Sequence, residues 1–144
     1  MTKIEVSCEL NATPTVVWED VRNIGTHVEW MHDAEAIDFT TATVEGVGTT
    51  FDCATKIGPL RLTDKMEITA WEPESVMGVR HVGLVTGEGQ FTLTALGDDR
   101  TRFEWAEELR FPWWMGGPIG GLVGGRILQA VWRRNLRLLA ARFR

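Results

Sequence analysis

The C-terminal segment from Arg126 to Phe143 has an apolar surface too wide for a helix that stands alone in water. At about 100° per residue, its large apolar side chains fall on one half of the helix surface and most of its arginines on the other. We therefore expect a helix over residues 126–143 that is covered by a large neighbouring element. The apolar half comprises Ile127, Leu128, Val131, Trp132, Leu136, Leu138, Leu139 and Phe143.

One polar residue, Asn135, lies near the centre of this apolar half. A buried amide needs hydrogen-bond partners. Asn135 therefore either ties the helix to a neighbouring backbone or points into a polar spot in a cavity.

Three glycine pairs precede this helix, at residues 116–117, 120–121 and 124–125, and they follow Trp113 and Trp114. Glycine in a helix costs about 1 kcal/mol relative to alanine, so the pairs predict a poor helix. We expect residues 113–125 to form a mobile gate over a pocket, with the two tryptophans capping one end of it. Alternatively, glycines four residues apart permit close packing against a neighbour.

Alternation of apolar and polar side chains predicts seven strands upstream of this segment. The first covers residues 3–10 and is followed by a helix that begins at Thr13 and Pro14 and by a short helical turn around Trp30. Six consecutive strands favour an antiparallel meander with one face on a core. A curved sheet around one long helix leaves room for a pocket. The six strands are expected at residues 36–44, 49–56, 60–71, 75–84, 88–96 and 101–111.

Length and charge limit the functional classes. A chain of 144 residues predicts one domain, residues 1–144, with a full core. The net charge is −5, but residues 126–144 hold six arginines and no acid, so the rest of the chain is strongly acidic. Nucleic-acid binding is disfavoured because the basic residues form one helical stripe on an acidic protein. Contact with a membrane surface is a weak alternative for the same reason.

The start of the chain is polar and strand-like, with no signal-peptide pattern, and Cys8 and Cys53 are the only cysteines. Both features predict a reduced, cytoplasmic setting. The longest uncharged run, residues 111–125, is shorter than the roughly 20 residues that a membrane-spanning helix needs. We expect no transmembrane segment, and the sequence sets no oligomeric state.

Two carboxylates share strand faces with apolar side chains. In the last strand Glu107 alternates in phase with Phe103, Trp105 and Leu109, and in the strand over residues 60–71 Asp64 alternates in phase with Leu62 and Met66. Burial raises the pKa of such a group and suits it to acid–base chemistry. Both faces of the strand over residues 75–84 are partly apolar, so a Glu107–His81 pair and an Asp64–Arg80 pair both stay open.

Metal and nucleotide motifs are missing. His27 and His32 are five residues apart, which does not match the four-residue spacing of a helical zinc motif. The glycine pairs match neither a P-loop nor a dinucleotide fingerprint. We expect no metal site and no cofactor.

The order of several short motifs over nearly the whole chain resembles the helix-grip superfamily (SRPBCC). That superfamily includes START domains, the birch pollen allergen group and the polyketide cyclase/dehydrase and lipid-transport proteins. The resemblance implies an α+β fold in which a curved seven-stranded antiparallel sheet wraps around the C-terminal helix, with two short helices between the first two strands. The matching motifs are Asn11-Ala12-Thr13-Pro14, Val17-Trp18, Trp30, Gly46-Val47-Gly48-Thr49, Ile68-Thr69-Ala70-Trp71-Glu72-Pro73, Arg100-Thr101-Arg102-Phe103, and Leu136 with Leu139.

For function, the resemblance implies a cavity under the last helix that binds a small or medium hydrophobic ligand, such as a lipid, an isoprenoid or a polyketide. The alternative is a cyclase or dehydratase that uses Glu107, Asp64 or His81 as acid or base. The superfamily shares no catalytic motif, so the sequence leaves carrier and enzyme open. The predicted ligand contacts are Trp30, Phe91, Leu93, Phe103, Trp105, Trp113, Val131 and Asn135.

Overall fold

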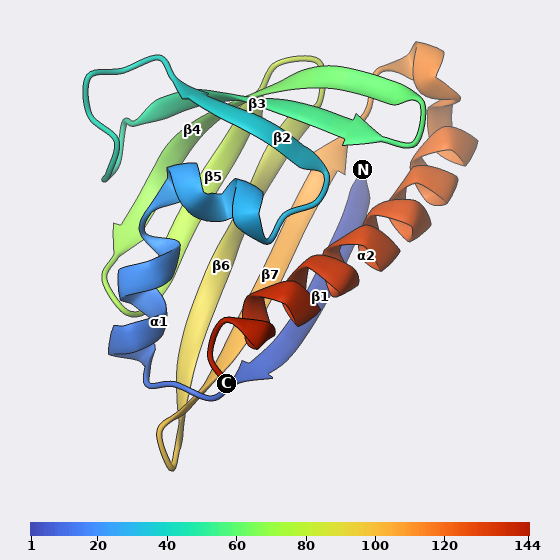
Figure 1. The fold of residues 1–144 in the computed structure, drawn as a ribbon. Coiled ribbons are helices and arrows are strands. Elements are labelled where there is room, and N and C mark those ends of the chain that lie inside the picture. Colours follow the sequence, from blue (N-terminus) through green and yellow to red (C-terminus); the bar gives the residue numbers. More distant parts are fainter.

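Seven strands form one antiparallel sheet in the computed structural model, which describes the backbone of residues 1–144 and the side chains outside residues 117 and 118 (Figure 1). The spatial order β1-β7-β6-β5-β4-β3-β2 places the first two strands of the sequence at opposite edges. The strands are β1 (Thr2–Leu10), β2 (Ala34–Phe39), β3 (Thr50–Ile57), β4 (Leu60–Glu72), β5 (Val76–Val82), β6 (Thr86–Gly97) and β7 (Arg100–Arg110).

Two short helices, α1 (Pro14–Val21) and η1 (Ile24–Glu29), carry the chain from one edge strand to the other. The Val16 N–H donates to Thr13 Oγ1 over 3.3 Å, and Pro14 occupies the first turn. The predicted helix start at Thr13 is therefore confirmed. Val17, Trp18 and Val21 form the buried side of α1.

The long helix α2 (Gly117–Ala141) crosses the concave side of the sheet and runs along β1 (Figure 1). It follows the short η2 (Trp113–Met115). Among the helices that the structure describes, none is long and apolar enough to cross a membrane.

The predicted start of this helix at Arg126 was wrong, because the helix already begins at Gly117. A methyl group on Gly125 would lie 2.6 Å from Thr2 Cγ2, and one on Gly121 would lie 3.0 Å from Thr2 Oγ1. These two glycines let α2 approach β1 closely, and the tertiary contact outweighs their low helix propensity. The close-packing alternative therefore describes Gly121 and Gly125, and the mobility of residues 113–125 stays a prediction.

The second half of α2 covers what we call the packed end of the concave space. Leu136 and Leu139 are 2% and 0% exposed there, beside Trp30 and Phe103 at 1% and 0%. The Trp30 and Phe103 rings meet edge to face with centroids 6.3 Å apart. This end holds a close-packed apolar core. The predicted architecture, a seven-stranded antiparallel sheet around a long C-terminal helix with two short helices inserted, is confirmed.

Candidate functional site

A cavity of about 350 Å³ lies between the sheet and the first half of α2, beyond the packed end. We call this region the hollow end. Leu60 and Ile127 both line the cavity and remain 39% and 47% exposed. The cavity therefore opens between the β3–β4 turn and α2. Its wall is mainly apolar and includes Phe51, Ile57, Leu62, Met66, Val79, Trp105, Leu128 and Trp132.

Three ionisable side chains meet in this apolar wall. Asp64 comes from β4, His81 from β5 and Glu107 from β7. His81 Nδ1–H donates to both carboxylate oxygens of Asp64 over 2.9 Å, and His81 Nε2–H donates to Glu107 Oε1. One imidazole thus bridges two carboxylates from strands that do not pair with each other.

Gly89 in β6 makes room for this bridge. His81 pairs with Gly87 across β5–β6, and Gly89 pairs with Glu107 across β6–β7. The His81 and Glu107 side chains must cross two strand spacings of roughly 4.8 Å each. A Cβ on Gly89 would lie 2.1 Å from Glu107 Cγ. Any other residue at position 89 therefore obstructs the Glu107 side chain.

The cluster keeps its histidine charged. Burial lowers the pKa of His81, but the hydrogen bonds to Asp64 and Glu107 and their negative charges outweigh burial and raise the pKa to about 10. His81 is an imidazolium at neutral pH, with both N–H groups donated to carboxylates. The second oxygen of Glu107 accepts from Trp105 Nε1–H over 2.7 Å. The site therefore combines one cation with two anions.

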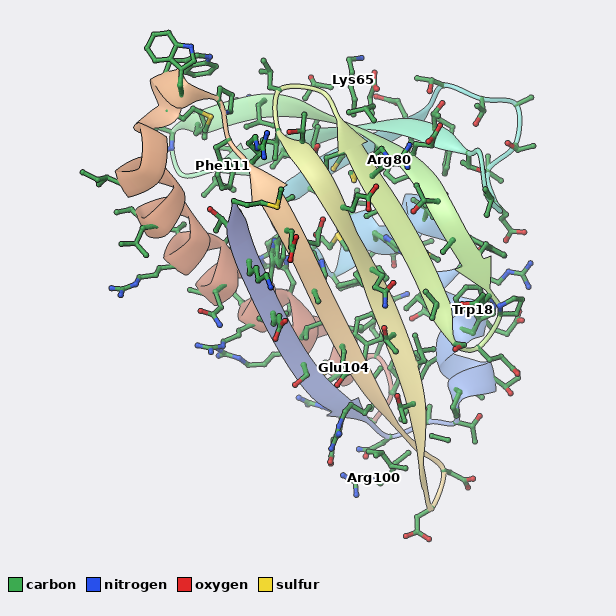
Figure 2. The ribbon with its side chains drawn as sticks, turned by 180° about the vertical axis from the view of Figure 1, so that it is seen from behind. Trp18, Lys65, Arg80, Arg100, Glu104 and Phe111 are labelled. Atoms are coloured by element: carbon green, nitrogen blue, oxygen red, sulfur yellow. The ribbon has the colours of Figure 1, made fainter. Side chains whose placement is uncertain are left out.

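All three predicted acid–base residues come together. Of the two pairs that the sequence left open, the structure contains the Glu107–His81 pair. The Asp64–Arg80 alternative does not occur. Arg80 lies on the convex face (Figure 2) and forms ion pairs of 3.4 Å with Glu67 and 3.2 Å with Glu88. The face of β5 that carries His81 is therefore the concave face, which lines the cavity.

The predicted ligand contacts divide between the two ends. Phe91 and Trp105 line the cavity. Trp113 is 85% exposed and points away from the core, so it does not cap the cavity. Among the side chains that the structure describes, the cavity wall does not include Trp30, Leu93, Phe103, Val131 or Asn135, and they drop out of the candidate site.

Asn135 is the clearest correction. Its side chain is fully buried, Oδ1 accepts from the His32 backbone N–H over 3.0 Å, and Nδ2 donates to Asp33 Oδ1 over 2.8 Å. Asn135 therefore ties α2 to the segment before β2, the first of the two alternatives that its position allows.

Sequence reasoning missed Asp33 and Trp132 as cavity residues. Asp33 lines the cavity, and burial raises its pKa, while the hydrogen bond from Asn135 opposes the shift. Trp132 stacks on Trp105 with centroids 4.2 Å apart and an interplanar angle of 10°. Trp132 was recognisable as a buried helix residue. Asp33 precedes β2 outside any periodic pattern and gave no signal.

His27, outside the cluster, has a structural contact. Burial lowers the pKa of His27 to about 4, so His27 is neutral and its Nε2–H donates to the Val21 carbonyl over 2.7 Å. Among the residues that the structure describes, no group of three histidine, cysteine or acidic side chains has an arrangement that could hold a metal ion.

Comparison with known proteins places this geometry in a family. The model of the family described as polyketide cyclase / dehydrase and lipid transport matches residues 1–144. A comparison with curated proteins finds no matching sequence.

Solved structures share the fold at low identity. A protein from Thermus thermophilus is 16% identical, with a TM-score of 0.82 over 98% of this chain and 96% of its own. The Zhui aromatase/cyclase from a Streptomyces species is 17% identical, with a TM-score of 0.71 over 96% of this chain and 88% of its own. A START superfamily protein from Mycobacterium smegmatis is 11% identical, with a TM-score of 0.78 over 99% of this chain and 97% of its own.

Proposed function

Because this chain belongs to the polyketide cyclase / dehydrase and lipid transport family, we propose that it binds a small hydrophobic molecule in the hollow end. The observation that carries the proposal is the cavity of about 350 Å³ with its mainly apolar wall. Small-molecule sites are concave, mainly apolar and lined by a few placed polar groups. The cavity has these three properties.

Its size favours a small ligand over a medium one. Ligand sites span roughly 300–1,000 Å³, and this cavity lies near the lower limit. The stacked Trp105 and Trp132 rings form one side. Flat or narrow apolar molecules fit such a space better than a two-chain lipid.

The charged side chains in the cavity wall favour some polar groups on the ligand over others. Asp33, Asp64 and Glu107 line the cavity with His81 as the one cation, and no lysine or arginine belongs to the lining that the structure describes. A carboxylic acid would bring another anion into an apolar space beside these groups, at a high desolvation and Coulomb cost. A neutral molecule with a hydroxyl group can instead donate a hydrogen bond to a carboxylate oxygen. We therefore expect hydrophobic alcohols to bind more tightly than acids of the same skeleton.

Calorimetric titration with 1-decanol and decanoic acid tests the site and its selectivity. Val79 lines the cavity, so Val79→Trp should fill it and abolish decanol binding. Val82 is 53% exposed outside the cavity, and Val82→Trp is the matched control that should keep wild-type affinity. Decanol binding that survives Val79→Trp would refute this site, and tighter binding of the acid would refute the selectivity.

A second candidate function, cyclisation or dehydration of a polyketide-type chain, is favoured by the Asp64–His81–Glu107 cluster. Buried titratable groups on a cavity wall are common in active sites. In this reading an Asp64 or Glu107 carboxylate accepts a proton from the carbon next to a carbonyl. His81 balances the carboxylate charge, and Asp33 is a candidate proton donor because burial raises its pKa. The hydroxyl group takes the proton of Asp33 and leaves as water, and the proton taken from carbon by Asp64 or Glu107 then returns to Asp33 through solvent.

Mass spectrometry can detect this loss of water from a short poly-β-keto thioester incubated with the protein. Glu107→Gln should lower the rate by about 10²–10⁴ if the carboxylate transfers a proton, while decanol affinity should change little. Arg80→Gln, on the convex face, is the matched control. Equal turnover in Glu107→Gln and wild type would remove Glu107 from the mechanism, and absence of product with wild type would leave the binding function alone.

A further inference from the structure

Large apolar side chains are exposed on η2 and the first half of α2. Trp113 is 85% exposed, Ile119 75% and Leu122 60%. Exposed apolar side chains gathered on one element indicate an interaction site, whereas single ones do not. We call this surface the exposed strip, and it comprises Trp113, Trp114, Ile119, Leu122, Val123 and Ile127.

Arginines continue the same helix face. At 100° per residue, Arg126, Arg133 and Arg137 fall within about 40° of Ile119 around the helix axis. These arginines and Arg134 are exposed, and among the side chains that the structure describes none of the four lies within 4 Å of a carboxylate. One face of α2 is therefore apolar in its first half and basic in its second.

The exposed strip borders the mouth of the cavity. Ile127 belongs to both, and Met115, Gly120 and Gly124 line the cavity from the same segment. The wall that separates the ligand from solvent at this point is thus one helix thick. A ligand that leaves through the opening emerges directly beside the exposed apolar side chains.

The convex face of the sheet carries acidic and basic side chains together, and among the described residues it lacks a basic stripe like that of α2. On β1 and β7, the exposed acids Glu5, Glu104 and Glu108 lie on the side turned away from α2 (Figure 2 shows Glu104), and the exposed bases Lys3, Arg102 and Arg110 lie among them. A negatively charged surface would therefore attract the helix side of the molecule more strongly than the sheet side. The charge distribution orients the exposed strip toward such a surface.

We propose that the exposed strip docks the protein onto a membrane surface that carries anionic lipids. Tryptophan favours the membrane–water interface, apolar helix faces insert to a shallow depth, and arginines bind anionic headgroups. A second copy of this chain fits the strip less well, because it would bring a second set of arginines toward the first. Docking rests on the strip alone, and only the transfer of ligand through the adjacent opening rests on the proposed function.

Co-sedimentation with vesicles tests the proposal on the full chain without a ligand. The protein should bind vesicles of phosphatidylcholine and phosphatidylglycerol in equal parts, and it should bind pure phosphatidylcholine far more weakly. An arginine near an anionic surface contributes roughly fivefold in affinity, so Arg133→Ala with Arg137→Ala should weaken binding roughly tenfold or more. Trp113→Ala with Trp114→Ala should weaken binding on both vesicle types.

Matched controls are Val16→Ala and Arg102→Ala, which remove an exposed apolar and an exposed basic side chain away from the strip. Both should bind like wild type, and thermal unfolding should show that all variants fold. No binding of wild type to anionic vesicles would overturn the proposal. Equal binding by the strip variants would also overturn it. Dimerisation that depends on the strip, without vesicle binding, would assign the surface to a second copy.

Discussion

The packed end and the hollow end share one sheet face and one helix, yet only one of them leaves room for a ligand. In the packed end Phe103, Leu136 and Leu139 fill the space between β7 and α2. In the hollow end, α2 lines the cavity with Gly124, where an added Cβ would meet no atom within 4 Å among the described residues, so this position leaves space unfilled. The size of the helix side chains along α2 therefore decides where the fold is a core and where it is a site.

Buried polar residues at the two ends also differ. The Asn135 amide uses both of its polar atoms in hydrogen bonds that hold α2 in place. The Asp64–His81–Glu107 cluster borders the cavity and carries charge. Burial of a polar group alone does not indicate function. Its position beside empty volume is the distinguishing observation.

The largest expected difference between the packed end and the hollow end is the loss of stability when a large side chain is replaced by alanine. Phe103→Ala in the packed end should lower the free energy of unfolding by about 3–5 kcal/mol, since large-to-small changes in a close-packed core lose contacts and leave a void. Met66 borders the cavity and is only partly buried, so Met66→Ala should cost less than about 2 kcal/mol. Urea unfolding of both variants measures the difference. Equal losses would show that the two ends are packed alike.

The charge cluster should make stability depend on pH. Folding raises the pKa of His81 from 6.5 to about 10, so its stabilisation is complete below pH 6.5 and is lost as the pH rises toward 10. Between pH 7 and pH 9 the free energy of unfolding should fall by roughly 2 kcal/mol. Urea unfolding across this range provides the measurement.

His81→Gln is the control for this pH dependence, because it removes the titrating group. The variant should be less stable at pH 7, since two buried carboxylates lose their cation, and its profile should be flatter. A wild-type profile as flat as that of the variant would mean that His81 is neutral in the folded protein.

Replacing either of two neighbouring glycines of α2 by alanine should change the free energy of unfolding, and the two changes should have opposite signs. A Cβ on Gly125 would lie 2.6 Å from Thr2 Cγ2, whereas a Cβ on Gly124 has no atom within 4 Å among the described residues. Gly125→Ala should therefore destabilise by about 1–3 kcal/mol. Gly124→Ala should stabilise by up to about 1 kcal/mol through helix propensity.

Thr2→Ser removes the obstructing methyl group and should rescue Gly125→Ala in the double variant. Thermal or urea unfolding of wild type, Gly125→Ala, Thr2→Ser and the double variant completes this double-mutant cycle. A stabilising Gly125→Ala would mean that α2 and β1 are less closely packed than the structure shows.

The sequence predicted the fold and the inward faces, because alternation and helical periodicity report which side of an element is buried. Glu107 and Asp64 were recognised in this way. The position of the void along those faces was not predictable, and the expected ligand contacts Phe103 and Asn135 both lie in the packed end. Gly89 in β6 was the available signal for the His81–Glu107 bridge, since a glycine inside a strand leaves space for a neighbour's side chain.

The most direct test of the central claim is to locate a ligand by NMR in protein with labelled methyl groups. In the complex with 1-decanol, nuclear Overhauser effects should connect the ligand to the methyl groups of Met66 and Ile57, which line the cavity. Leu136 and Leu139, in the packed end, should show none. Contacts to Leu136 or Leu139 would contradict the assignment of the ligand site to the hollow end.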